Sequence, residues 1–163
     1  MLSSILKKSD CAECRFCCSF RRQSLWETPI FDAELTEKLR THYPTVKFRP
    51  VKNSFTFDIS DQYKTDDPEE EAPCPFLDPD RGCQLPPALK PFDCSIWPLR
   101  AVRQPSGRLA VALTPTCPAI NKVPEEQLRT LAASGLGKKI LDYAQAHPDI
   151  IKDYSDFLSN NIF

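Results

Sequence analysis

The sequence has only four glycines and one methionine among its 163 residues, and it has no long apolar run. It contains no glycine-rich turn of the kind that binds phosphates or dinucleotides. The G-x-S-x-G and H-E-x-x-H motifs of common hydrolases and metalloproteases are also missing. No apolar stretch approaches the roughly 20 residues that span a bilayer. We therefore expect no membrane partner, and the motifs leave open whether the chain is an enzyme.

A strong excess of charge of either sign is missing as well. The 21 lysines and arginines nearly balance the 22 aspartates and glutamates, which leaves a net charge of −1. Proteins that bind nucleic acid usually carry a basic surface, so we expect no nucleic-acid partner. The first ten residues hold few apolar side chains, and their lysines follow these instead of preceding a long apolar stretch, unlike a secretory signal. We therefore expect a cytoplasmic location, where cysteines stay reduced.

The length and composition predict one folded domain. A chain of 163 residues with 41% hydrophobic and 26% charged residues is typical of a single globular domain. We expect an α+β fold that is small, irregular and loop-rich, and that is organised around a cysteine metal centre. The single cysteine-cluster domain would span 1–163, with its central part at 11–118 and a helical extension at 124–163.

Periodicity predicts the elements of the first half of the chain. Apolar residues at near-helical spacing predict an amphipathic helix over 30–43, which Pro44 ends. Alternating residues predict a hairpin of strands 46–51 and 54–59. The acidic run 66–71 is interpreted as a solvated loop, with a carboxylate metal site as the alternative.

The second half is predicted to begin with an irregular, proline-dense segment over 73–98. The turn at 78–82 within it would return Cys83 towards Cys74. A strand is expected over 108–113. Two or three short helices are expected from Pro124 onward, with breaks at the Gly135–Gly137 segment and at Pro148.

Eight cysteines are the most informative feature of the chain. The first four form the pattern C-x2-C-x2-C-C, and a helix that starts after Asp10 would carry them on one broad face. Grouped thiolates repel one another, and a bound cation or cluster offsets that repulsion. The other four lie in loops or at element ends and can converge on the first group. An even number of cysteines also permits a disulfide framework. The candidate metal ligands are Cys11, Cys14, Cys17, Cys18, Cys74, Cys83, Cys94 and Cys117.

Other polar residues near these motifs receive simpler interpretations. The two histidines, His42 and His147, have no neighbouring partner motif, so surface or capping roles are favoured over ligation. Arginines that flank the cysteine segments could neutralise an anionic site, but solvated surface charge is favoured for each. These arginines are Arg15, Arg21, Arg22, Arg100 and Arg103.

The order of the cysteine blocks resembles the YkgJ-type cysteine-cluster family, whose members are described as zinc- or iron-chelating proteins. The resemblance covers roughly residues 11–118 and implies that the cysteines are metal ligands. Lys90, Ser95 and Trp97 stand where arginine, arginine and phenylalanine are usual in the family. The matching blocks are Cys11-Ala-Glu-Cys14-Arg-Phe-Cys17-Cys18, Cys74-Pro-Phe-Leu77, Gly82-Cys83 and Lys90-Pro-Phe-Asp-Cys94-Ser-Ile-Trp-Pro98.

The spacing favours an iron–sulfur cluster, of the 4Fe-4S type, over zinc. Three cysteines at successive x2 spacing with a distant Cys-Pro are similar to cluster ligands of ferredoxins. Structural zinc usually takes paired C-x2-C units, and only one such unit is present before the long gaps. The expected function is redox chemistry, metal handling or structural support, with a protein partner allowed. The alternatives are an iron–sulfur enzyme related to protein lysine methylases and a structural zinc module for protein–protein interaction.

A final expectation joins the two groups of cysteines. The segment from Cys74 to Cys94 has little periodic apolar content, so metal ligation is the favoured explanation for its fixed conformation. We predict that at least one of Cys74, Cys83 and Cys94 lies close to the 11–18 segment and shares its metal centre.

Overall fold

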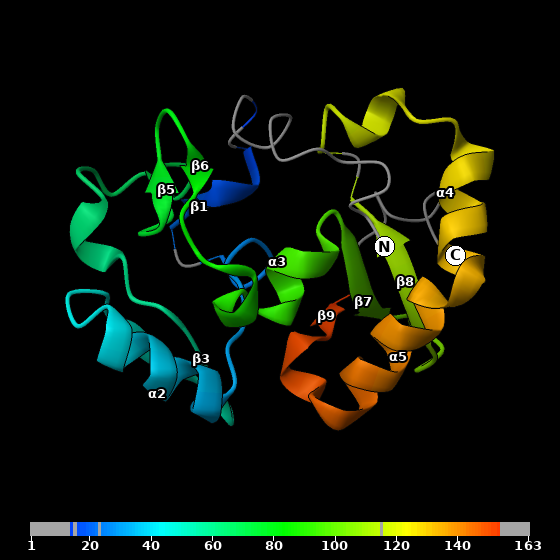
Figure 1. Cartoon of the computed structure of the whole chain (residues 1–163), viewed down its shortest axis with the longest axis horizontal. Coiled ribbons are helices and arrows are strands. Elements are labelled where there is room, and N and C mark those ends of the chain that lie inside the picture. The colour runs from blue at the N-terminus through cyan, green and yellow to red at the C-terminus, as the bar shows by residue number, and fades with distance from the viewer. Residues whose placement is uncertain (1–13, 15, 23, 115, 154–163) are drawn as a thin grey trace. The chain divides into compact units, whose positions relative to one another are not determined.

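The structure, a computed structural model, describes residues 14, 16–22, 24–114 and 116–153. Short sheets and a few helices make up the fold (Figure 1). The predicted mixture of α and β structure is confirmed, whereas its organisation around a metal centre stays a prediction. The described residues divide into two compact units, the N-terminal unit at 14–95 and the C-terminal unit at 96–153. The prediction of a single domain over 1–163 stays a prediction.

The N-terminal unit opens with the second half of the C-x2-C-x2-C-C motif. Cys14 has helical backbone, and a short 3-10 helix, η2, spans Phe16–Cys18. The strand β1, Ser19–Arg21, follows directly. The start of the predicted helix, including Cys11, lies outside the described residues. The predicted α-helical face does not extend to Cys18, because a 3-10 turn holds three residues instead of 3.6.

The helix α2, Ala33–His42, follows β1. The carboxylate of Asp32 accepts a hydrogen bond of 2.7 Å from the backbone N–H of Leu35, which caps the helix. The predicted helix therefore begins three residues too early, because Asp32 is its cap and Phe31 forms an extended bridge with Phe55. Its predicted end at Tyr43, just before Pro44, is confirmed.

The predicted hairpin is also present in the N-terminal unit. Strands β2, Phe48–Val51, and β3, Ser54–Phe57, pair antiparallel around Lys52 and Asn53. Both strands are shorter than predicted. Lys52 takes a positive φ of 53°, which the tight connection requires.

The proline-dense segment and the residues just before it contain more regular secondary structure than predicted. They hold strands β4 (Glu71–Pro73), β5 (Leu77–Asp78) and β6 (Gly82–Cys83), and helices η4 (Pro87–Leu89) and α3 (Phe92–Ile96). Another short helix, η3 (Ser60–Gln62), precedes them. Strand β4 pairs with β1, and β5 pairs with β6, both antiparallel. These short elements are stabilised by local hydrogen bonds and by pairing with a distant strand, and apolar periodicity predicts neither of them.

An aromatic core supports these short elements. Phe31 and Phe57 are both buried, and their ring centroids lie 4.8 Å apart in an edge-to-face arrangement. Cys74 and Cys83 pack against this core. The cysteine segments are therefore held on one side of an ordinary hydrophobic cluster. Its buried members are Phe20, Phe31, Leu39, Phe57, Ile59, Ala72, Phe76 and Leu85.

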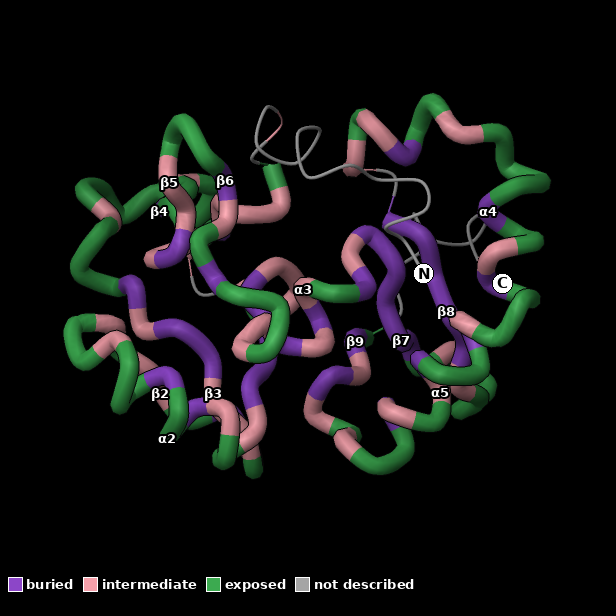
Figure 2. Tube along the Cα trace, viewed as in Figure 1, coloured by how far each residue is buried: buried purple, intermediate pink, exposed green. Residues whose placement is uncertain are grey.

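The C-terminal unit contains a three-stranded sheet in the order β8-β7-β9. Strand β7, Leu99–Arg103, pairs antiparallel with β8, Leu109–Leu113, and parallel with β9, Lys152–Asp153. Figure 2 shows β7 and β8 buried along almost their whole length. The predicted strand over 108–113 is confirmed as β8. Strands β7 and β9 lie outside the sequence predictions, and β9 stands where a helix was expected.

Helices follow β8 in the C-terminal unit, as predicted. The bounds are η5 (Ile120–Lys122), α4 (Glu125–Leu131), the π-helical turn η6 (Ala132–Leu136), α5 (Gly137–Ala146) and η7 (Pro148–Ile150). Helix α5 packs against β7 and β8. The predicted break at the glycines is present, because Gly135 has a φ of 101° between α4 and α5.

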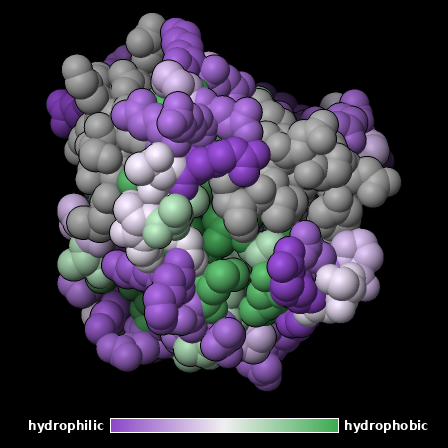
Figure 3. Space-filling model, turned by 90° about the vertical axis from the view of Figure 1, so that its right-hand side faces the viewer, coloured by the Kyte–Doolittle hydropathy of each residue, from purple (hydrophilic) through white to green (hydrophobic). Residues whose placement is uncertain are grey.

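Among the described residues on the side of α4 and α5, hydrophilic side chains surround a hydrophobic area (Figure 3). Exposed ion pairs lie along these helices, such as Arg129 with Glu125 and Lys138 with Asp142. Among the residues described, no helix has the length and apolar character needed to cross a membrane.

Candidate metal centre

The N-terminal unit holds most of the described cysteines. Cys14, Cys17 and Cys18 precede β1, Cys74 follows β4, Cys83 ends β6, and Cys94 lies in α3. Cys117 lies in the C-terminal unit, between β8 and η5. Each of these side chains is half-buried, and no disulfide joins any two of them. Cys11 lies outside the described residues, so the structure does not place it.

The pairing of β1 with β4 brings the two groups of cysteines together. The backbone N–H of Cys74 donates a hydrogen bond of 2.7 Å to the carbonyl oxygen of Cys18. This bond continues the register of the strands, in which Ser19 lies opposite Pro73 and Phe20 opposite Ala72. Cys18 and Cys74 therefore meet at the end of one ladder, although 55 residues separate them in sequence.

The predicted turn at 78–82 returns the chain from Cys74 to Cys83. The carboxylate of Asp78 accepts hydrogen bonds from the backbone N–H groups of Asp80 and Arg81, at 2.9 and 2.8 Å. Gly82 has a positive φ of 73°, which a residue with a Cβ adopts only with strain. The turn closes the β5–β6 hairpin and places Cys83 opposite Leu77, whose N–H donates to the carbonyl oxygen of Cys74 at 2.9 Å.

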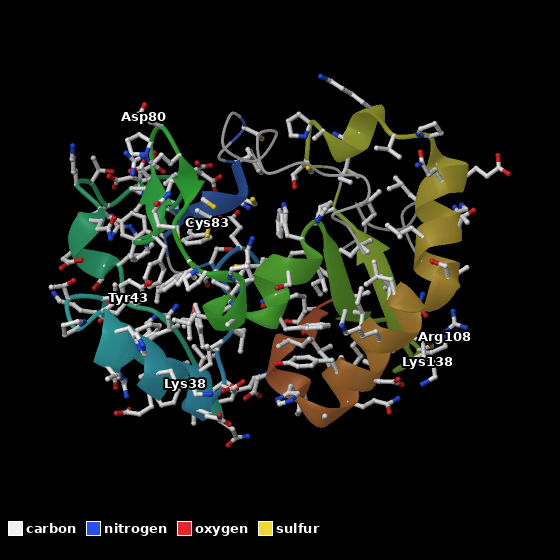
Figure 4. All side chains as sticks on the ribbon, in the orientation of Figure 1. Lys38, Tyr43, Asp80, Cys83, Arg108 and Lys138 are labelled. Atoms are coloured by element: carbon white, nitrogen blue, oxygen red, sulfur yellow. The ribbon has the colours of Figure 1, made fainter. Side chains whose placement is uncertain are left out.

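The thiols of this region interact electrostatically. Burial raises the pKa of the Cys74 thiol most, a backbone hydrogen bond from Phe76 lowers it by less, and the charges of Cys94, Cys83 and Cys17 each raise it by a smaller amount. Figure 4 shows sulfur atoms beside the labelled Cys83, in agreement with these interactions. Electrostatic coupling of this kind weakens with distance and is strongest where water is largely excluded.

Cys17 is held in the neutral form in the same way. Its pKa is raised first by a side-chain hydrogen bond with Cys18, then by burial and by the charge of Cys18. Lys90 opposes this shift, because its positive charge favours the thiolate. Several ionised thiols are therefore costly here without a further positive charge, and a thiophilic cation or cluster supplies one.

The arrangement of the side chains falls short of a formed site. Among residues 14, 16–22, 24–114 and 116–153, no three Cys, His, Asp or Glu side chains are placed to hold one metal ion. The donor chemistry of the clustered thiols nevertheless fits a soft metal or an iron–sulfur cluster. The proximity of the two cysteine groups is a property of the fold, and their sharing of one metal centre stays a prediction.

The other candidates take structural roles in the described chain. The Nδ1 atom of His42 lies 2.8 Å from the carbonyl oxygen of Lys38, and the ring of His147 stacks on Tyr143 with centroids 4.2 Å apart. Arg15 lies outside the described residues, Arg21 and Arg103 are exposed as expected, and Arg22 is half-buried against Glu70. Arg100 is only 2% exposed, and its guanidinium lies 4.1 Å from the centroid of the Trp97 ring. Interpreting Arg100 as a solvated surface charge was wrong, because it points inward from β7.

The acidic run 66–71 is a solvated loop only in part. Asp66, Asp67 and Glu69 are exposed, as predicted, and Glu71 belongs to β4. Glu70 is different, because its carboxylate accepts several hydrogen bonds and pairs with Arg22. Sequence reasoning did not single out Arg22 and Glu70 as a pair, since no local pattern connects residues so far apart in the chain.

Comparisons of the chain with protein-family models, curated proteins and solved structures give no match. The resemblance to the YkgJ-type cysteine-cluster family therefore stays a prediction from the cysteine blocks.

Proposed function

We propose that this chain is a metal-binding protein whose N-terminal unit holds an iron–sulfur cluster or zinc through its cysteines. The observation that carries the proposal is the meeting of the two cysteine groups. Cys18 and Cys74 are joined by a backbone hydrogen bond of 2.7 Å, and the Cys74 thiol interacts with those of Cys17, Cys83 and Cys94.

The proposed ligands come first from the cysteines that this fold clusters. Cys17, Cys18, Cys74, Cys83 and Cys94 offer more thiols than a four-coordinate site requires. Cys11 and Cys14 complete the first motif and remain candidate ligands, as does Cys117 in the C-terminal unit. A bound cation lowers the cost of ionising neighbouring thiols, so its binding draws the partly buried sulfur atoms together.

An iron–sulfur cluster is the favoured occupant. The run of three cysteines at x2 spacing together with Cys74-Pro75 is similar to ferredoxin ligand patterns. The resemblance to the zinc- or iron-chelating cysteine-cluster proteins supports a metal but not one metal in particular. Zinc in a thiolate site is the second candidate, because such donors suit both. The centre would serve redox chemistry, metal handling or folding.

Anaerobic purification followed by analysis of iron, zinc and acid-labile sulfide tests this proposal. Stoichiometric iron with sulfide identifies a cluster, and stoichiometric zinc without sulfide identifies a zinc site. The variants Cys83→Ser and Cys94→Ser should each lower the metal content at least several-fold, because each removes a metal–sulfur bond. The matched control is Ser95→Ala, which changes the exposed neighbour of Cys94. Wild-type protein with no stoichiometric metal, or full metal content in both cysteine variants, contradicts the proposal.

A further inference from the structure

The pairing of β1 with β4 extends beyond the two strands at both ends. At one end, the backbone N–H of Cys74 donates to the carbonyl oxygen of Cys18 at 2.7 Å. At the other end, the N–H of Arg22 donates to the carbonyl oxygen of Glu70 at 3.2 Å. Between these bonds Ser19, Phe20 and Arg21 lie opposite Pro73, Ala72 and Glu71. Arg22 and Glu70 therefore belong to the same continuous register as Cys18 and Cys74.

This register decides which side chains share a face. Successive side chains alternate between the two faces of a strand, and directly opposite residues share one. Phe20 and Ala72 are 2% and 1% exposed, so their face is the core side. Cys74, Arg22 and Glu70 belong to that same face by alternation, and Cys18, the last residue of η2, is held opposite Cys74 by their backbone hydrogen bond. A slip of one residue would turn Cys74 to the other face, away from Cys18.

Arg22 is held at the far end of this ladder by three different contacts. Its Nη2 atom lies 3.2 Å from the Oε2 atom of Glu70 and also donates to the carbonyl oxygen of Thr65. Its guanidinium carbon lies 4.6 Å from the centroid of the Tyr63 ring. The hydroxyl of Tyr63 in turn donates to the carbonyl oxygen of Phe20 at 2.9 Å. Arg22 thereby links β1 to the loop that leads into β4.

Glu70 stabilises the same loop by accepting hydrogen bonds from Lys64 and Thr65. Its carboxylate accepts hydrogen bonds from the backbone N–H groups of Lys64 and Thr65 at 2.7 and 2.8 Å, and from the Thr65 hydroxyl at 2.8 Å. Its side chain is 19% exposed, whereas that of the neighbouring Glu69 is 71% exposed. A half-buried carboxylate with this many donors constrains the backbone more than an exposed ion pair does.

We propose that Arg22 and Glu70 form a positioning pair that sets the register of β1 against β4 and so keeps Cys18 and Cys74 within reach of one metal centre. This inference rests on the proposed function, since it concerns how the metal ligands are placed. Neither residue is itself a ligand. Their contribution is to hold two ligand-bearing segments in the one register that keeps Cys74 opposite Cys18.

Co²⁺ titration of the metal-free full chain under anaerobic, reducing conditions tests the inference. The variant Glu70→Gln keeps the shape of the side chain but removes its charge, so it weakens both the link to Arg22 and the bonds from the Lys64–Thr65 loop. We expect its Co²⁺ affinity to fall about 10- to 100-fold, the range typical of residues that orient ligands. The matched control is Glu69→Gln, which removes an exposed pair with Arg21 and should change the affinity less than about threefold.

The absorption of bound Co²⁺ distinguishes positioning from general destabilisation. Thiolate-to-cobalt charge-transfer intensity per bound ion reports the number of sulfur ligands, so Glu70→Gln should lower it, and Glu70→Asp should restore part of it. A variant that only reduces the folded fraction leaves this intensity unchanged. If Glu70→Gln loses its folded circular dichroism spectrum, Arg22→Lys replaces it, with a loss of affinity and intensity expected.

The possible results separate the two proposals. Wild-type chain that carries no native metal and binds no Co²⁺ overturns the proposed function. If the wild type binds Co²⁺ and Glu70→Gln matches Glu69→Gln in affinity and intensity, the positioning role alone is overturned. The same holds for Arg22→Lys where it replaces Glu70→Gln.

Discussion

At the scale of single residues, the half-buried thiols of Cys17 and Cys74 influence how the stability of the metal-free protein depends on pH. The pKa of Cys17 is raised by its hydrogen bond with Cys18 and by burial, and that of Cys74 by burial and the neighbouring thiols. In the unfolded chain these thiols ionise near their ordinary pKa of about 8.5. As the pH rises past that value, the unfolded state loses protons while the folded state keeps them, so the folded state loses stability.

We therefore predict that the free energy of unfolding of the metal-free protein falls between pH 8 and pH 10. Urea unfolding under anaerobic, reducing conditions measures it at each pH. The variant Cys74→Ser should show a shallower fall, because one buried thiol no longer contributes. An unfolding free energy that stays constant or rises over this range in the wild type is incompatible with the raised pKa values.

Residue identity also explains the partial success of the site predictions. The cysteines were identified from the sequence because their spacing is a local pattern. In the structure, most of the described cysteines belong to one unit. Arg22 and Arg100 carry no such pattern. The first pairs with Glu70, and the second is buried under the ring of Trp97, so neither role follows from its neighbours in sequence.

At the scale of elements, the β5–β6 hairpin is a short local structure whose turn positions Cys83. Gly82 adopts a φ of 73° at its turn, and Gly107 adopts 84° in the turn between β7 and β8 of the other unit. Alanine at either position costs about 1 kcal/mol, because a Cβ disfavours the left-handed region. The two substitutions are therefore similar in backbone strain, although Gly82 is buried and Gly107 is exposed, and they differ in the residue that follows the turn.

We predict that Gly82→Ala lowers the metal content or the metal affinity, while Gly107→Ala lowers the stability but leaves metal binding unchanged. The reason is that only the first turn leads directly into a candidate ligand, Cys83. Metal analysis after anaerobic purification, together with urea unfolding, measures both quantities. Equal metal content in the two variants would show that the hairpin geometry has no part in ligand placement.

Elements with local signals were predicted best. Helix α2 has the Asp32 cap and the limiting Pro44, and the β2–β3 hairpin has alternating residues around Lys52 and Asn53. Strands β4, β5 and β6 span two or three residues each, which is too short for periodicity to appear. Strand β9 owes its conformation to parallel pairing with β7, a partner about 50 residues away in the chain.

At the scale of the whole molecule, the division into two compact units predicts an uneven response to metal removal. Of the candidate ligands that the structure describes, all but Cys117 belong to the N-terminal unit. Metal-binding free energy is folding free energy for the segment that supplies the ligands. We therefore expect chelation to increase backbone amide hydrogen exchange mainly within 14–95.

Hydrogen-exchange mass spectrometry with and without a chelator measures this difference. Peptides from β1, β4 and the β5–β6 hairpin should lose the most protection, and peptides from β7, β8 and α5 should lose the least. Equal loss in both units would indicate a single cooperative domain, as the sequence predicts. Unchanged exchange after complete metal removal would contradict a structural role for the metal.

The sequence by itself determined the features that depend on neighbours along the chain. These are the cysteine spacing, the end of α2 before Pro44, the β2–β3 hairpin and the turn that returns to Cys83, because caps, turns and periodicity act over a few residues. Tertiary structure alone decided the pairing of β1 with β4, the burial of Arg100 and the pairing of β9 with β7. Their partners lie far away in the chain, and side-chain packing selects such partners only once the chain has folded.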